Sequence, residues 1–282
     1  MKKFVNIDWE SLTIANNYVF LEVMKNKELC KQLVEQILHI QIKDIHYLET
    51  EKSISARLTS KSVRLDVYVE DEHGTVINLE MQVTGKNSTV YRDTDEETVI
   101  RELPLRVRYY QSLISMDMLR KGMDYPDLRK SYVIFICTFD PFGKGWPLYS
   151  FRYRSNEDAS LEMGDLTENI YLNAKAADKA ADKELAAFLS YVNGKAAESA
   201  FTQAIDRETV RVKSDDAWRD RVMTWEMDMR VMQRHTAEKA EKKGEKKKAI
   251  EIAKRLLKKG TMSIGEIAEA TSLTTQEVSA LE

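Results

Sequence analysis

The segment from residue 64 to residue 82, RLDVYVEDEHGTVINLEMQ, constrains the fold of this chain more than any other stretch. It contains two runs of alternating apolar and polar residues that are separated by a short loop, in which Gly74 can adopt the positive φ of a bulged β-hairpin turn. The alternation specifies the register, because a slip of one residue would pair apolar side chains with polar ones. The expected apolar pairs are Val69–Ile77, Val67–Leu79, Leu65–Met81 and Val63–Val83.

The opposite face of this hairpin places Asp66 directly across from Glu80. Opposed Cβ atoms lie about 4.5–5.5 Å apart, so two carboxylates at these positions repel unless a positive charge lies between them. Mg²⁺ is commonly held by one or two carboxylates together with water and phosphate, which makes the pair a candidate metal site. Gln82 projects from the same face and could orient a metal-bound water. A simpler alternative is a solvated face whose acids are neutralised by Arg64.

Composition limits the class of protein. The chain has 282 residues, of which 43% are hydrophobic and 32% are charged, so it can bury a sizeable core. A net charge of −3 means that any contact with DNA must come from local patches. Two distant cysteines, Cys30 and Cys137, predict reduced thiols rather than a disulfide framework. Because no apolar run reaches the length of a membrane span, and no signal peptide is recognisable, we expect a cytoplasmic protein with no membrane partner.

Hydrophobic periodicity predicts alternating helices and strands along the first part of the chain. Helices are expected at 11–38 and 95–121, and strands at 44–57, within the hairpin at 64–82, and at 131–139, 148–154 and 169–174. The helix at 95–121 is expected to place Leu105, Tyr109, Leu113 and Met116 on one side. This order of elements favours an α/β or α+β layered core with a central sheet flanked by helices.

The character of the sequence changes after about residue 178. We therefore divide the chain into a core at 1–178, a helical extension at 179–245 and a small tail at 246–282. Within the extension, Trp218, Val222, Trp225, Met229 and Met232 are spaced like the a and d positions of a coiled coil. This seam predicts either a homodimer or packing of the helix against the protein's own core.

The last part of the chain carries a basic run and two helix-start signals. Residues 236–260 contain ten Lys or Arg and four Glu, which is typical of a solvated helix face and, as an alternative, of an arm that binds phosphates. The pairs Ser263/Glu266 and Thr274/Glu277 have the spacing of capping boxes and predict a trihelical, helix-turn-helix-like tail. Sequence-specific DNA recognition by this tail would depend on Gln276, the one suitable residue at the start of its last helix.

Asp66, followed by a tight turn and then by Glu80-Met81-Gln82, resembles the motif of the PD-(D/E)XK nuclease superfamily in a Glu-X-Gln variant. More closely, the chain is similar to the Rpn-like, recombination-promoting nuclease and transposase family. The stretches that share its pattern are Asn17 to Phe20, Arg106, Tyr109 to Ser112, Gly122 to Tyr125, the strand that ends at Phe139, and the tail KKGTMSIGEIAEATSLTTQEVSALE. The resemblance covers nearly the whole chain.

This resemblance implies a restriction-endonuclease-like α/β core, with a mixed sheet and an all-α C-terminal extension. It also implies hydrolysis of DNA phosphodiester bonds with Mg²⁺ (or Mn²⁺), where Asp66 and Glu80 bind the metal and act in catalysis with Gln82. Arg106 and Tyr110 are candidate substrate-binding residues, and an ion-paired arginine with a core tyrosine is the alternative for them.

The sequence departs from the family pattern at three positions. Leu65 replaces the proline before the first acid, Gln82 replaces the motif lysine, and Asn17 stands where many relatives have an acid. A lysine can help to generate the attacking hydroxide, whereas a glutamine can only form hydrogen bonds. The alternative function is therefore a catalytically degenerate nuclease fold that serves as a DNA-binding or protein-interaction module.

Overall fold

The computed structural model describes residues 7–54, 63–84, 95–119 and 122–281. The chain forms two compact units, one of which is Ile7–Trp218 and the other of which includes Arg219–Glu282. The first unit contains the sheet. It extends beyond residue 178 and includes helices α4 (Lys183–Val192) and α5 (Ala200–Lys213), which the sequence analysis assigned to the helical extension.

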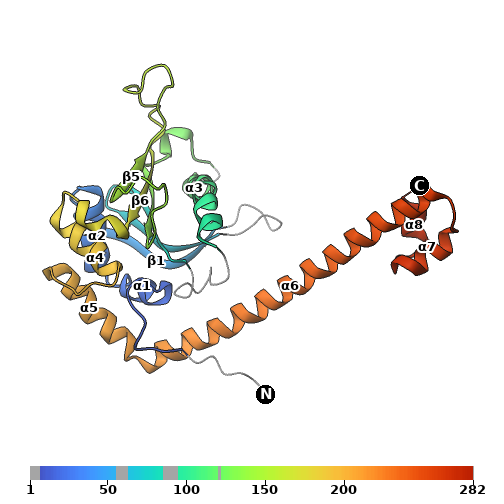
Figure 1. The fold of residues 1–282 in the computed structure, drawn as a ribbon. Coiled ribbons are helices and arrows are strands. Elements are labelled where there is room, and N and C mark those ends of the chain that lie inside the picture. Colours follow the sequence, from blue (N-terminus) through green and yellow to red (C-terminus); the bar gives the residue numbers. More distant parts are fainter. Residues whose placement is uncertain (1–6, 55–62, 85–94, 120–121, 282) are drawn as a thin grey trace. The chain divides into compact units, whose positions relative to one another are not determined.

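A six-stranded sheet forms the centre of the first unit (Figure 1). Its strands, in chain order, are β1 (Ile45–Ile54), β2 (Val63–Asp71), β3 (Val76–Gln82), β4 (Ser131–Cys137), β5 (Leu148–Phe151) and β6 (Thr167–Asn173). Their spatial order is β1-β2-β3-β4-β6-β5, with parallel pairing of β3 with β4 and of β4 with β6, and antiparallel pairing elsewhere. Every residue of β3 and β4 is buried, which is expected for central strands covered on both faces. The predicted mixed α/β fold is confirmed.

The register of the hairpin is confirmed near its turn. Val69 pairs with Ile77 and Val67 pairs with Leu79, and Gly74 has the positive φ of 73° that the loop requires. The two further pairs that were predicted, Leu65–Met81 and Val63–Val83, do not form. Beyond Val67, strand β2 continues along β1, whereas β3 continues along β4 to Gln82, so the two strands diverge.

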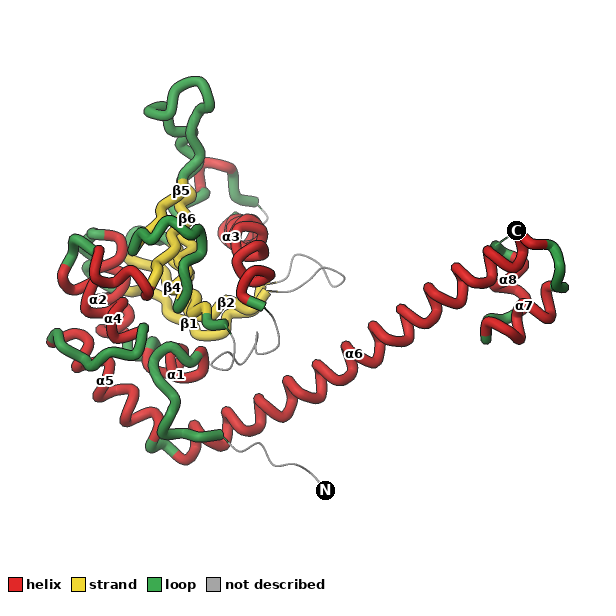
Figure 2. The backbone as a smooth tube through the Cα atoms, viewed as in Figure 1, coloured by secondary structure: helices red, strands yellow, loops and turns green. Residues whose placement is uncertain are grey.

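Helix α3 (Glu96–Met118) covers one face of the sheet, but not with the side that was predicted (Figure 2). Leu113 is buried, whereas Leu105 and Met116 are 56% and 55% exposed. The buried stripe consists of Val99, Leu103, Val107, Tyr110, Leu113, Ile114 and Met118, together with Gln111. It runs along one side at spacings of three and four. Of the predicted residues, Leu113 lies in this stripe and Tyr109 is partly buried beside it, whereas Leu105 and Met116 lie outside it.

Helices α1 (Asn17–Val23) and α2 (Lys27–Leu38) contact the other face of the sheet, and α4 and α5 pack against these two helices (Figure 2). The single helix predicted at 11–38 is wrong, because the chain forms two helices with separate caps. The Asn16 side chain accepts N–H groups at the start of α1, and the Asn26 side chain does the same for α2. Asparagine is one of the preferred residues at this position, so the two asparagines were the signal for two helix starts.

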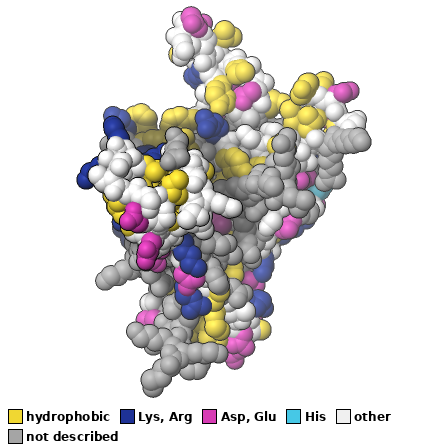
Figure 3. Space-filling model, turned by 90° about the vertical axis from the view of Figure 1, so that its right-hand side faces the viewer, with side chains coloured by type: hydrophobic (Ala, Val, Ile, Leu, Met, Phe, Trp, Pro, Cys, Tyr) yellow, Lys and Arg dark blue, Asp and Glu magenta, His cyan; other side chains and the backbone are white. Residues whose placement is uncertain are grey.

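The segment between β5 and β6 projects beyond the sheet as a long loop, with one bridge between Arg154 and Glu162 (Figure 1). Figure 3 shows hydrophobic side chains beside acidic ones on this projection, at the top of the view. Exposed apolar residues in and beside it are Phe151, Tyr153, Leu161, Met163 and Leu166. Within the described part of the chain, no helix combines the length and apolar character that crossing a membrane requires.

Helix α6 (Asp216–Lys259) is a single element of 44 residues. At its start, Trp218 is 2% exposed and its ring meets that of Trp9 at 5.7 Å, edge to face, so the first residue of the predicted seam packs within the first unit. The side chains of Met229 and Met232 lie outside the described residues, and dimerisation through the seam stays a prediction. The basic run lies within this helix, and Lys242, Lys247 and Lys248 in it are exposed.

The end of α6 packs with α7 (Ile264–Thr271) and α8 (Thr275–Ser279) around a small apolar cluster. Its buried members are Ala253, Ile267, Ala268, Leu273 and Val278. Both predicted capping boxes are present, one at Ser263 and the other at Thr274. The Lys246 ammonium also meets a Glu277 carboxylate oxygen at 2.5 Å, which ties α8 to α6.

Candidate active site

The residues that the hairpin motif singled out lie where β2 and β3 diverge. Asp66 is the first residue of β2 beyond the ladder, and Glu80 and Gln82 are near the C-terminal end of β3. Helix α3 passes over this point and contributes Arg106 and Tyr110. The structure therefore brings all five predicted residues together from three different elements.

Hydrogen bonds between side chain and backbone explain why Asp66 and Glu80 tolerate each other. The N–H of Asp66 donates to Glu80 Oε1 at 3.1 Å, and the N–H of Met81 donates to Asp66 Oδ2 at 3.2 Å. Both N–H groups lie where the ladder between β2 and β3 has ended, so each requires another acceptor. Each carboxylate supplies an acceptor to the opposite strand, so the two acids bridge the gap that the divergence opens.

Glu80 is held deep in the protein. Its side chain is 2% exposed, and its Oε1 also accepts the Asn78 amide at 3.0 Å. Burial raises the pKa of the Glu80 carboxyl above its ordinary value, although the nearby Arg106 and the donated hydrogen bonds act in the opposite direction. Removal from water is the dominant cause, because a buried carboxylate loses more hydration than these contacts return.

Arg106 is the positive charge that lies beside the acids. Its guanidinium donates to Gln82 Oε1 at 2.7 Å and to the Tyr110 hydroxyl at 2.9 Å, and it lies 3.5 Å from Glu80 Oε2. The guanidinium carbon also lies 5.2 Å from the centre of the Phe135 ring, within the range of a cation–π contact. Burial, followed by the charge of Glu80, raises the pKa of Tyr110, so this residue stays a neutral phenol.

The amide nitrogen of Gln82, rather than its carbonyl oxygen, is available to a bound ligand. Its side chain is 2% exposed, and its carbonyl oxygen already accepts from Arg106. Its amide nitrogen has no hydrogen-bond partner among the residues that the structure describes. Asn17, at the start of α1, donates to the carbonyl of Met81 at 3.2 Å and so packs against the same stretch of β3.

The carboxylate oxygens at this site are of the kind that a hard divalent cation takes as ligands. Among the described residues there is no group of three or more His, Cys, Asp or Glu side chains that could hold a metal. Asp66 and Glu80 make a two-carboxylate set, which is enough for Mg²⁺ when water and phosphate complete the coordination. Arg106 lies beside Glu80 Oε2, so a cation that binds this oxygen must compete with the guanidinium.

A sequence model of the PD-(D/E)XK nuclease family transposases matches residues 15–250. The chain belongs to this family. Comparisons with curated proteins and with solved structures found no match. PD-(D/E)XK nucleases generally use divalent metal ions, and the matched range includes the whole sheet and all five residues of the candidate site.

For this PD-(D/E)XK protein, sequence reasoning missed Asn78 as a site residue, and it named Arg64 as the compensating charge only in the alternative of a solvated hairpin face. Asn78 is two residues before Glu80 on the same strand face, so the alternation was a sufficient signal for it. Its amide nitrogen holds Glu80, while its Oδ1 is buried and has no hydrogen-bond partner among the described residues. The Arg64 side chain lies outside the described residues, whereas Arg106 is the arginine that the structure shows beside Glu80.

Proposed function

We propose that this protein is a divalent-metal-dependent DNA endonuclease that hydrolyses phosphodiester bonds during recombination or transposition. Membership of a nuclease and transposase family supports a role of this kind. The observation that carries the proposal is the bridge between Asp66 and Glu80, in which two carboxylates at the divergence of β2 and β3 are fixed by backbone N–H groups. Such fixed oxygens form a preorganised site, because their orientation does not depend on a bound ligand.

Asp66 and Glu80 are the residues that would hold Mg²⁺ (or Mn²⁺). When bound there, a divalent ion polarises the scissile phosphate and lowers the pKa of a water molecule. The protein orients the ligand oxygens through the N–H groups of Asp66 and Met81 and the amide of Asn78. The buried position of Glu80 also keeps bulk water away, which strengthens its interaction with a cation.

Arg106 provides a fixed positive charge beside Gln82, the residue that replaces the motif lysine. Negative charge develops on the phosphoryl oxygens in the transition state, and a guanidinium held in place stabilises that charge without reorganisation. Gln82 and Tyr110 position the guanidinium through hydrogen bonds of 2.7 and 2.9 Å. The remaining amide nitrogen of Gln82 is suited to donate to a phosphate oxygen or to the oxygen of a water molecule.

Plasmid cleavage with Mg²⁺ or Mn²⁺ tests the proposal. The wild-type protein should nick or cut the plasmid, and EDTA should stop the reaction. Asp66→Asn keeps an oxygen for the N–H of Met81 but removes the charge, so it should fold and should not cleave. Glu102→Gln is the matched control, because Glu102 is an exposed acid on α3, one turn before Arg106. Metal-dependent cleavage by a folded Asp66→Asn protein would exclude this site.

A catalytically degenerate DNA-binding module is the second candidate function. The observation that favours it is the position of Arg106, which already compensates the buried Glu80 from within the protein. In that case DNA should bind without being cut, and neither Mg²⁺ nor Mn²⁺ should raise the melting temperature. A metal-dependent rise that Asp66→Asn abolishes distinguishes the enzyme from this alternative, since ligands that bind the native state stabilise it.

A further inference from the structure

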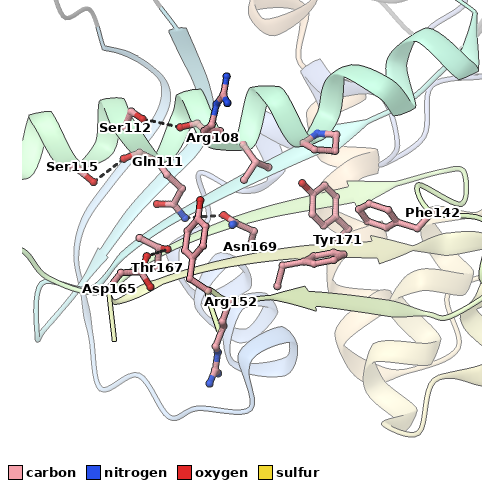
Figure 4. A pocket seen from close by; sticks show the side chains of 14 residues that line it. Arg108, Gln111, Ser112, Ser115, Phe142, Arg152, Asp165, Thr167, Asn169 and Tyr171 are labelled. Carbon is pink, nitrogen blue, oxygen red and sulfur yellow. Dashed lines mark hydrogen bonds between the residues drawn. The ribbon is translucent and has the colours of Figure 1, made fainter. Parts of the chain in front are cut away.

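A cavity of about 450 Å³ lies between α3 and strands β5 and β6 (Figure 4). Arg108 lines it, and at about 3.6 residues per turn Arg106 projects from nearly the opposite side of α3. This volume is within the range of about 300–1,000 Å³ that small-molecule sites occupy. None of the five residues of the candidate active site lines it. The cavity stays open because α3 presents the short side chains of Ser112 and Ser115 toward it, and both hydroxyls bond to carbonyls of their own helix.

One end of the cavity is aromatic. The rings of Phe142 and Tyr171 lie 5.0 Å apart, and Phe151 lies 5.0 Å from Phe142 and 5.7 Å from Tyr171. These rings pack on one another at steep angles, so they form a rigid wall. Phe151 is nevertheless 44% exposed, which leaves apolar ring surface beside the cavity for a planar partner.

The other end carries oriented polar groups. Gln111 donates to Asn169 Oδ1 at 2.9 Å, while the Ser131 hydroxyl donates to Gln111 Oε1 at 2.7 Å, so the orientation of both amides follows from this chain (Figure 4). The Asn169 Nδ2 group is therefore a fixed donor, and it has no hydrogen-bond partner within the described part of the chain. Asp165, which accepts from the Thr167 hydroxyl, adds carboxylate oxygen atoms to the same end.

Arg152 and Arg108 line the cavity and differ in whether an acidic side chain neutralises them. Arg152 is paired with Glu168 at 2.8 Å and with Glu162 at 3.2 Å. Arg108 is exposed and forms no ion pair with any residue that the structure describes. The Arg108 guanidinium points away from strands β5 and β6 (Figure 4), so its positive charge is available to an anionic group outside the cavity.

We propose that this cavity binds a nucleobase whose attached phosphate faces Arg108. A base is planar and stacks on aromatic rings, and its edge offers both acceptors and donors, which match the Asn169 amide and the Asp165 carboxylate. The phosphate matches the uncompensated guanidinium of Arg108. An aliphatic ligand would leave the donor and the acceptor at the polar end without partners.

The nucleobase can come from a free mononucleotide or from the DNA strand at the active site. The second source rests on the proposed function. Strand β6 lies two strands from β3, which is about 10 Å, or roughly three stacked nucleotides of one DNA strand. Phe135 links the two places, because its ring centre lies 5.2 Å from the Arg106 guanidinium carbon and 5.6 Å from the Tyr171 ring. The two places are therefore neighbours in the fold, on either side of the buried Phe135.

The test uses the full-length wild-type protein in EDTA, which prevents metal-dependent cleavage. The probe is a single-stranded oligonucleotide with one 2-aminopurine, whose fluorescence changes when it stacks, and dAMP is the competitor. Ser112→Trp fills the cavity and Arg108→Ala removes the charge at its mouth. The matched controls are Glu102→Trp and Arg101→Ala, which make the same kinds of change at exposed positions of α3 that do not line the cavity.

Ser112→Trp should weaken binding of the probe by about five- to 100-fold, the usual value of one stacked base, and the controls should bind as the wild type does. If dAMP displaces the probe, the site accepts free nucleotides, and if only oligonucleotides compete, the base comes from a strand. Either result supports the cavity as a base site, whether or not the protein cleaves DNA. Unchanged affinity for both probe and dAMP in Ser112→Trp, at an unchanged melting temperature, would overturn the proposal, as would no binding by the wild type.

Discussion

Arg106 and Arg108 lie two residues apart on α3 and point to opposite flanks of this helix, in surroundings that differ in almost every respect. The Arg106 side chain is 20% exposed and is held by Gln82, Tyr110 and Glu80. The Arg108 side chain is exposed and forms no ion pair within the described residues. The first arginine is therefore fixed before any ligand arrives, whereas the second must lose side-chain entropy when it binds one.

This difference separates two kinds of contribution to an enzyme. A charge that is fixed in advance stabilises a transition state, because no reorganisation is needed when charge develops. A charge that is ordered only on binding contributes to the affinity of the ground state as well. The inner flank of α3, which carries Arg106, should therefore govern kcat. The outer flank, which carries Arg108, should govern KM or Kd. Five measurements test this division.

The largest effect is expected for Glu80→Gln, which removes a charge from the inner flank and keeps the shape and the hydrogen-bond acceptor. Cleavage should fall by at least about 1,000-fold, because metal-assisted hydrolysis loses one of two carboxylate ligands. Without metal, the melting temperature should not fall, since burial already disfavours the charged form of Glu80 and raises its pKa. Plasmid cleavage and thermal melting check both statements, and a marked loss of stability would contradict this account.

Arg106→Ala and Arg108→Ala compare the two flanks directly. Loss of Arg106 should lower kcat by about 100-fold, the usual effect of removing one preorganised donor to transition-state charge. Loss of Arg108 should leave kcat within about twofold and raise KM for a single-stranded substrate. Steady-state kinetics on an oligonucleotide provide the measurement. If both substitutions change kcat by the same factor, the division between the flanks is wrong.

Gln82 should matter less than either acid. Gln82→Ala removes a neutral hydrogen bond that water can partly replace, so about a tenth of the rate should remain. Gln82→Lys restores the residue that is usual in the superfamily, but here its ammonium would lie beside the Arg106 guanidinium, which now contacts Gln82 at 2.7 Å. Repulsion should displace Arg106 and lower the rate further. A higher rate for Gln82→Lys would show that the inner flank accepts a second cation.

Positive charges on α6, outside both flanks of α3, should change only the affinity for DNA. Lys242, Lys247 and Lys248 are exposed on α6, and changing all three to Gln should weaken DNA binding. The slope of log K against log salt should become shallower by close to three, at about 0.9 for each phosphate contact that is lost. Lys183→Gln with Lys195→Gln is the control on the first unit. An unchanged slope would show that the run is only a solvated helix face.

The smallest expected effect is a change of stability with pH, which arises from Glu80. Because the pKa of Glu80 is raised in the folded protein, the native state keeps a proton that the unfolded chain releases above its ordinary pKa of 4.5. The stability of the wild type should therefore decrease, relative to Glu80→Gln, as the pH rises from 4.5 toward the folded pKa. Melting curves of the two proteins over this window test the sign, and a wild type that gains relative stability would contradict it.

Local patterns in the sequence were sufficient to predict part of the fold and of the candidate site. The turn at Gly74 and the strict alternation beside it specify the pairs Val67–Leu79 and Val69–Ile77, because both signals lie within a few residues of the contacts. The apolar run at 131–139 likewise identifies the buried strand β4. The Glu-X-Gln motif in this hairpin indicated the family before any long-range contact was known.

Other features depend on contacts between distant segments and could not be predicted in the same way. The ladder ends at Val67, where β2 keeps its pairing with β1 and β3 keeps its pairing with β4, and the local pattern of the hairpin does not encode these pairings with other strands. Which side of α3 is buried depends on the sheet beneath it, so Leu105 was misplaced. The contact of Arg106 with Gln82 and the cavity between α3 and β6 arise only when these elements pack together.

The bridge between Asp66 and Glu80 also bears on how such a protein can evolve. Each side chain supplies an acceptor to a backbone N–H of the neighbouring strand, so an apolar replacement would leave that N–H without a partner. A lineage that loses cleavage is therefore expected to pass through Asn or Gln at these positions, which keep the oxygen and discard the charge. When a protein of this fold loses catalysis, we expect Asn or Gln to replace its two acids, and we do not expect apolar residues there.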